Sequence, residues 1–108
     1  MGIHKLIISR GSIANPKFIV TDANNNPVDY SGCTVSCKAK LTLRDPNTKI
    51  AVTGSVGGTN NNEITVNFGE NDTNIPAGLY KYSVKVTNGT TIKDYIVTDD
   101  LEIIDVVD

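Results

Sequence analysis

The sequence predicts an all-β fold, an antiparallel β-sandwich, and three observations within residues 77–89 favour it. The first is an alternation of apolar and polar side chains, typical of a half-buried strand, with the apolar positions at Tyr80, Tyr82, Val84 and Val86. The second is Asn88-Gly89 directly after this strand, because both residues tolerate the positive φ angles of a tight hairpin turn. The third is Ala77-Gly78-Leu79-Tyr80, whose spacing matches a tyrosine corner, in which a tyrosine ties a crossing to upstream backbone.

The first half of the chain contains four predicted strands. The first covers residues 3–9, and the second covers residues 18–22, followed by a loop rich in Asn, Asp and Pro. The third, residues 33–43, is the longest alternating segment, and its predicted inward positions are Cys33, Val35, Cys37, Ala39, Leu41 and Leu43. The fourth is weakened by Gly54 and is marked by Ile50, Val52 and Val56.

The second half continues the pattern of short strands and polar turns. A hairpin loop at residues 57–62 leads to a fifth strand marked by Ile64, Val66 and Phe68. A polar crossing at 69–76 precedes the sixth strand. If Asn88-Gly89 is a two-residue turn, Tyr82 pairs with Tyr95 on the seventh strand. Residues 101–107 form either an eighth strand or a continuation beyond a kink at Asp99-Asp100.

Seven or eight such strands, with no segment of helical period, predict an immunoglobulin-like sandwich with Greek-key connections. At 108 residues the chain is expected to form a single domain, residues 1–108. The net charge of −2 argues against a nucleic-acid partner, because duplex-binding domains usually carry a basic face. No apolar run approaches membrane-spanning length, so no membrane partner is expected.

The two cysteines, Cys33 and Cys37, fall on the same face of one predicted strand. Four residues of strand span about 13 Å, whereas a disulfide needs Cα atoms within about 7 Å, so the two cannot bridge. They are interpreted as reduced core residues, which indicates synthesis in a reducing cytoplasm. Metal binding by these thiols is not expected, since a second pair of ligands is missing and the one histidine, His4, is distant.

No constellation of residues predicts catalysis, a cofactor or a metal. A single histidine excludes most histidine-based triads, and no glycine-rich segment precedes a helix. The segment Asp22-x-Asn24-x-Asn26 begins like a calcium loop, but Pro27 and Cys33 occupy the positions that need Gly and Glu. An ordinary turn is therefore favoured, and a weaker calcium site shared with Asp29 stays open.

Two sets of surface candidates have alternative interpretations. Tyr30 and Tyr95 are either platforms on which a sugar stacks or lids over the core, and the second is favoured for single tyrosines of a sandwich. Four lysines point outward and form a basic stripe if their strands are neighbours: Lys38, Lys40, Lys81 and Lys85. The favoured interpretation of this stripe is that it keeps the sheet soluble and blocks edge pairing.

Three segments resemble small immunoglobulin-like domains of phage particles. They are residues 18–22 (Phe-Ile-Val-Thr-Asp), 26–35 (Asn-Pro-Val-Asp-Tyr-Ser-Gly-Cys-Thr-Val) and 77–84 (Ala-Gly-Leu-Tyr-Lys-Tyr-Ser-Val). In this respect the chain is similar to the N-terminal domain of siphophage baseplate upper proteins and to related virion accessory domains. It is expected to depart from the baseplate proteins in length, without a host-binding or trimerising part after residue 108.

The resemblance implies a non-enzymatic virion module in the baseplate, in the tail or on the head. Such a module is made in the host cytoplasm, docks onto other virion proteins and can form a homo-oligomer on the particle. The candidate docking residues are Ile3, Leu6, Ile8, Ile103, Ile104, Val106 and Val107, although core packing explains them equally well. The alternative is a module that binds a glycan or host surface through the loops at 22–30 and 57–62, using Asn24, Asn26, Tyr30, Asn60 and Asn61.

Overall fold

The computed structural model describes residues 5–42, 44–89 and 91–105, with only the backbone at 91–93. Within them the chain forms seven strands and one helical turn, α1 (Glu70–Thr73). The strands are β1 (Leu6–Ser9), β2 (Lys17–Ile19), β3 (Thr34–Lys40), β4 (Ile50–Gly57), β5 (Glu63–Val66), β6 (Gly78–Asn88) and β7 (Thr91–Ile104). The predicted strand positions are therefore largely confirmed, whereas α1 lies in the crossing for which no helix was predicted.

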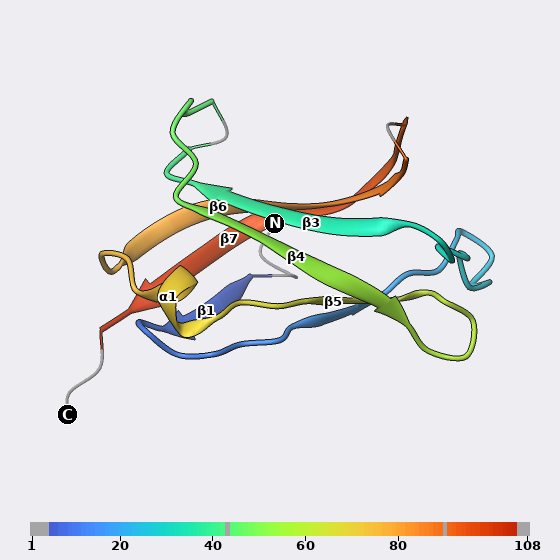
Figure 1. Cartoon of the computed structure of the whole chain (residues 1–108), viewed down its shortest axis with the longest axis horizontal. Coiled ribbons are helices and arrows are strands. Elements are labelled where there is room, and N and C mark those ends of the chain that lie inside the picture. The colour runs from blue at the N-terminus through green and yellow to red at the C-terminus, as the bar shows by residue number, and fades with distance from the viewer. Residues whose placement is uncertain (1–4, 43, 90, 106–108) are drawn as a thin grey trace.

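The seven strands form one continuous sheet in the order β1-β7-β6-β3-β4-β5-β2, curled into a half-barrel (Figure 1). The prediction of two separate sheets is wrong. The sheet is also mixed, because β1 runs parallel to β7, with Leu6 opposite Leu101 and Ile8 opposite Ile103. The other strand pairs are antiparallel, as predicted.

Strand β4 explains why the sheet is continuous. Its first part, Ile50–Gly54, pairs with β3, and its second part, Gly54–Gly57, pairs with β5. Gly54 belongs to both ladders, and a Cβ atom there would collide with the carbonyl oxygen of Thr65. The missing side chain thus lets β5 approach at the point where β4 changes partner. A strand shared in this way joins what the prediction treated as two layers.

The core fills the inside of the half-barrel. Phe18 of β2 and Tyr82 of β6 lie on opposite halves of the curled sheet, and their ring centroids are 6.5 Å apart. Alternation along β3 is confirmed, since Val35, Cys37 and Ala39 are buried. It ends earlier than predicted, because Leu41 lies beyond β3 and is exposed, and Leu43 lies outside the described residues.

The predicted tyrosine corner is present. The Tyr80 hydroxyl donates a hydrogen bond of 2.6 Å to the carbonyl oxygen of Pro76, four residues upstream. This bond fixes the end of the crossing that α1 begins. At its other end, the buried Thr73 hydroxyl donates to the carbonyl oxygen of Ser12 at 2.6 Å. The crossing is thereby attached both to β6 and to the segment that links β1 with β2.

The register of the β6–β7 hairpin differs from the prediction. Asn88 pairs with Thr91, and irregularities between Val84 and Lys85 and between Val86 and Thr87 shift the register further along the strands. Tyr82 consequently lies opposite Asp99, so the predicted pairing of Tyr82 with Tyr95 is wrong. Strand β7 continues through Asp99 and Asp100 to Ile104, so an eighth strand does not begin there.

Candidate functional site

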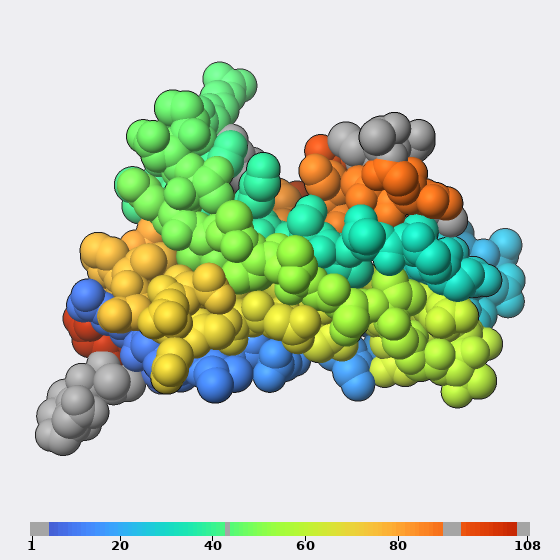
Figure 2. All heavy atoms as spheres, in the orientation of Figure 1, coloured from blue at the N-terminus to red at the C-terminus, as the bar shows by residue number. Residues whose placement is uncertain are grey.

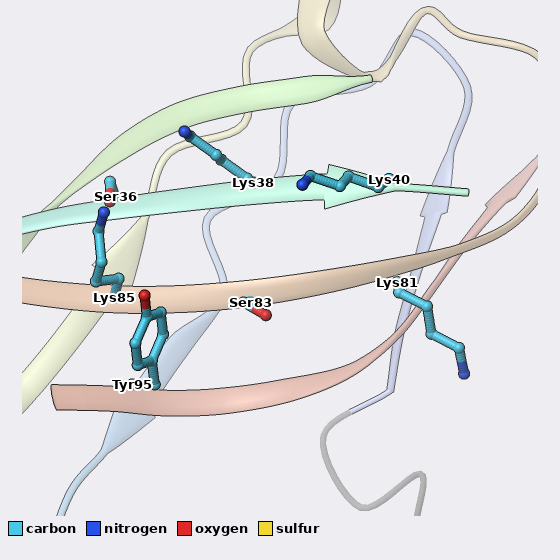
Figure 3. Close-up of a pocket in the computed structure, with 7 residues that line it drawn as sticks. All are labelled: Ser36, Lys38, Lys40, Lys81, Ser83, Lys85 and Tyr95. Atoms are coloured by element: carbon cyan, nitrogen blue, oxygen red, sulfur yellow. The ribbon is translucent and has the colours of Figure 1, made fainter. Parts of the chain in front are cut away.

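A hollow of about 320 Å³ lies on the outer face of β3, β6 and β7, and we call it the basic saddle. Figure 2 shows this face dipping between the raised β3–β4 connection and the raised turn of the β6–β7 hairpin. Lysine and hydroxyl side chains dominate its lining, which consists of Ser36, Lys38, Lys40, Lys81, Ser83, Lys85 and Tyr95 (Figure 3).

Strand pairing brings these residues together. Across β3 and β6, Ser36 lies opposite Lys85, Lys38 opposite Ser83, and Lys40 opposite Lys81. Because alternate residues of both strands are committed to the core, these six must face outward. The predicted basic stripe is therefore confirmed as a geometric feature. Strand β7 adds Tyr95, which pairs with Lys85.

The lysines of the saddle differ in their electrostatic surroundings. Lys81 forms an ion pair and hydrogen bond with Asp100 on β7, and in Figure 3 its side chain points away from Lys40. No carboxylate of the described residues forms an ion pair with Lys38, Lys40 or Lys85. Three positive charges therefore share a hollow without an internal counter-charge, an arrangement that attracts an anion.

An aromatic ring and several hydroxyls complete the saddle. The Tyr95 side chain is 59 % exposed and projects from β7 toward Lys85 (Figure 3). The hydroxyls of Ser83 and Thr98 lie 3.0 Å apart and hydrogen-bond to each other. The saddle thus offers cations, hydroxyl donors and acceptors, and one exposed π-face in the same place.

The interpretation of Tyr30 as a platform for a sugar is wrong, and its alternative as a core lid is confirmed. Its side chain is 0 % exposed, so no ligand can stack on the ring. Its hydroxyl donates to Asp94 Oδ2 at 2.9 Å. Burial, followed by this hydrogen bond to a carboxylate, raises the pKa of Tyr30 to about 12. Tyr95, by contrast, is exposed, so a sugar can stack on its ring.

The two Asn-rich loops lie side by side, since the Tyr30 amide donates to the carbonyl oxygen of Asn61 at 2.9 Å. Asn24, Asn26 and Asn60 are exposed, and Asn61 is half-buried with a φ of 55°. Asp22 Oδ1 accepts the amides of Asn24 and Asn26, at 2.8 and 3.0 Å, as the turn interpretation predicts. Glycan binding by these loops stays a prediction, but the buried ring of Tyr30 cannot take part in it.

The candidate docking residues fall into three groups. Ile8 and Ile103 are buried in the core, and Leu6 is half-buried against it. Ile104 is exposed, whereas Ile3, Val106 and Val107 lie outside the described residues. Core packing therefore accounts for Ile8 and Ile103, and Ile104 is the one left with an exposed side chain.

Two exposed apolar residues that were not predicted as docking residues lie near Ile104. Ile7 and Leu79 are 61 % and 52 % exposed, and both lie in register with Glu102 of β7, one on each side. Ile104 follows two residues after Glu102 and is 37 % exposed. We call Ile7, Leu79 and Ile104 the outer apolar patch. The signal that could have found it is the phase of β1: if Ile8 faces inward, Ile7 must face out.

The part of the chain that the structure describes gives no sign of a metal site. It contains no group of three or more His, Cys, Asp or Glu residues placed to hold a metal ion. No helix among the described residues is long and apolar enough to cross a membrane. Cys33 and Cys37 are both free thiols.

Comparison with known proteins does not assign the chain to a family. The sequence matches no model of a known protein family, and no curated protein is significantly similar to it. The resemblance to phage virion domains therefore stays an inference from the residues quoted above.

Proposed function

We propose that this chain is a non-enzymatic structural or accessory module of a phage particle, which acts by docking onto other virion proteins. Its fold is proposed to be a single-sheet variant of the immunoglobulin-like Greek key, in which β4 pairs with both β3 and β5. The tyrosine corner formed by Tyr80 and Pro76 supports this fold. Its proposed location is the virion, after synthesis in the host cytoplasm, and the free thiols agree with such an origin.

The outer apolar patch is the observation that carries the proposal. Its three large side chains are exposed on β1, β6 and β7 around Glu102, and apolar surface bordered by polar residues can mark an interaction site on a small protein. Its outermost strand, β1, is at the end of the sheet order, so its free edge can also pair with a partner strand. Contacts by face and edge together would hold the module on a larger assembly or beside a second copy.

The proposal is tested with particles of the encoding phage assembled without this chain. The purified protein is added at micromolar concentration, and ordered extra density is sought by electron microscopy. We expect the native chain to bind and Ile7→Glu to abolish binding, because it adds a second carboxylate beside Glu102 that would be buried on docking. Ile19→Glu is the matched control, since Ile19 is 68 % exposed on β2, at the opposite end of the sheet order. Failure of the native chain to associate would refute the proposal.

A further inference from the structure

We propose that the basic saddle binds an anionic saccharide. The sugar ring lies against Tyr95, and a phosphate or carboxylate group is held by Lys38, Lys40 and Lys85. This function is separate from docking through the outer apolar patch, which lies on β1, the far part of β7 and the start of β6. A failure of one proposal therefore leaves the other standing.

The position of the lysines argues against the role of edge protection. Lysines guard a sheet against aggregation when they lie on edge strands. Strands β3 and β6 each have a hydrogen-bonded neighbour on both sides, β4 and β6 for β3, and β3 and β7 for β6. None of Lys38, Lys40 and Lys85 therefore lies on an edge strand. By contrast, Lys5, Arg10 and Lys17, on or beside the edge strands, each pair with a carboxylate.

The exposure of Tyr95 points to a ligand with a flat apolar face. The chain has four tyrosines, and the other three, Tyr30, Tyr80 and Tyr82, are buried. Figure 3 shows Lys85 reaching from β6 toward Ser36 of β3, with the Tyr95 ring on the other side of β6. A sugar ring can lie on the aromatic face while its hydroxyls meet Ser36 and Ser83, and the anionic group then reaches the ammonium groups.

The hollow fits a saccharide better than an acidic peptide or a nucleic acid. Strands β3 and β6, which carry its lysines, have a paired strand on both sides, so a peptide cannot add as a strand beside them and would meet the lysines through side chains alone. Its volume of about 320 Å³ is at the lower end of small-molecule sites, roughly 300–1,000 Å³. A single aromatic ring cannot stack successive bases, and the net charge of −2 opposes a long polyanion.

The test is a titration of ¹⁵N-labelled protein followed by amide chemical shifts. The probes are glucose 6-phosphate, which carries a phosphate, and cellobiouronic acid, which carries a carboxylate, with cellobiose as the neutral reference. We expect saturable shifts at Ser36, Lys38, Ser83, Lys85 and Tyr95 with at least one anionic sugar. The affinity for cellobiose should be lower by at least about tenfold. The tighter of the two anionic probes identifies the acid group.

Variants separate the two halves of the site. The double change of Lys38→Gln and Lys85→Gln should weaken binding about tenfold or more, because it removes two charge-assisted contacts. Tyr95→Ala should weaken it about fivefold, whereas Tyr95→Phe keeps the ring and should bind like the native chain. Lys17→Gln is the control for charge alone, since Lys17 lies on β2 and outside the hollow.

Three results would overturn the proposal. One is equal or tighter binding of hexa-aspartate or hexathymidylate, which would assign the hollow to an acidic peptide or to single-stranded nucleic acid. Another is inorganic phosphate binding as tightly as the sugar phosphate with no effect of Tyr95→Ala, which would indicate an adventitious ion only. The last is the absence of shifts at about 10 mM of either anionic sugar, well above a weak dissociation constant of about 1 mM.

Discussion

The inner and outer faces of β3, β6 and β7 are formed by alternate residues of the same strands, but the residues of the two faces have different roles. On the inner face Cys37, Tyr82 and Val84 are buried and packed, so their size and shape decide the stability of the fold. On the outer face Lys38 and Tyr95 are exposed and contribute little packing. The fold is therefore held by one set of residues, and the other set is free to define what the surface binds.

The largest expected effect tests this division within two adjacent residues. Tyr82→Ala removes a buried ring that packs near Phe18, and it should lower the free energy of unfolding by about 3–5 kcal/mol. Ser83→Ala, on the opposite face of the same strand, should change it by less than about 0.5 kcal/mol. Urea unfolding of both variants measures the contrast. Similar losses in the two would show that the outer face also supports the fold.

The next effect concerns the place where β4 changes partner. Gly54→Ala introduces a Cβ atom against the Thr65 carbonyl oxygen and the Val35 side chain, and it should cost about 1–3 kcal/mol of stability. Gly57→Ala is a matched control on the same strand, because no heavy atom lies within 4 Å of its added Cβ. The midpoints of urea unfolding should differ clearly between them. Equal midpoints would mean that β5 can shift away without cost.

A smaller effect separates a buried tyrosine hydroxyl from an exposed one. Tyr80→Phe removes the hydrogen bond to Pro76, and it should destabilise the protein by about 0.5–1.5 kcal/mol. Tyr95→Phe removes a hydroxyl on the outer face, and thermal unfolding should show no measurable loss. If Tyr80→Phe unfolds at the native temperature, the tyrosine corner does not contribute to stability.

The last prediction leaves the native fold unchanged and concerns the thiol on the inner face. Burial raises the pKa of the Cys37 thiol from 9.0 to about 12, so its reactive thiolate is scarce in the folded state. In a Cys33→Ser variant, a thiol reagent should modify Cys37 only as fast as the protein unfolds. Because the unfolded thiol ionises at lower pH than the folded one, stability should also fall as the pH rises above 9.0. Rapid modification near neutral pH would contradict the burial of this residue.

Local patterns predicted the inner face well because burial leaves a period of two in the sequence. The inward positions of β3 and β6 and the tyrosine corner were all identified in this way. The continuity of the sheet was not, because a strand that changes partner has the same alternation as one that does not. Gly54 was noticed only as a weak point of β4, and its role depends on Thr65, which the local sequence does not place beside it.

The candidate site was predicted in part. The lysine stripe followed from alternation, on the condition that the strands were neighbours, and the pairing of β3 with β6 meets that condition. Tyr95 was assigned to the wrong partner for two reasons: Asn88, which was predicted to lie in the turn, pairs with Thr91, and the irregularities of the β6–β7 hairpin shift the register further. A small error in the predicted register therefore separated Tyr95, the exposed tyrosine, from the lysines beside which it lines the saddle in the structure.

The parallel alignment of β1 and β7 has a mechanical consequence. If the chain is pulled apart at Lys5 and Asp105, the two strands are drawn in opposite directions along their common axis. The four residue pairs between Leu6 and Ser9 then resist the force together in shear, instead of opening one after another like a zipper. A module anchored through these two points should withstand brief stretching, and single-molecule pulling from a different pair of points, with a lower rupture force, would reveal that anisotropy.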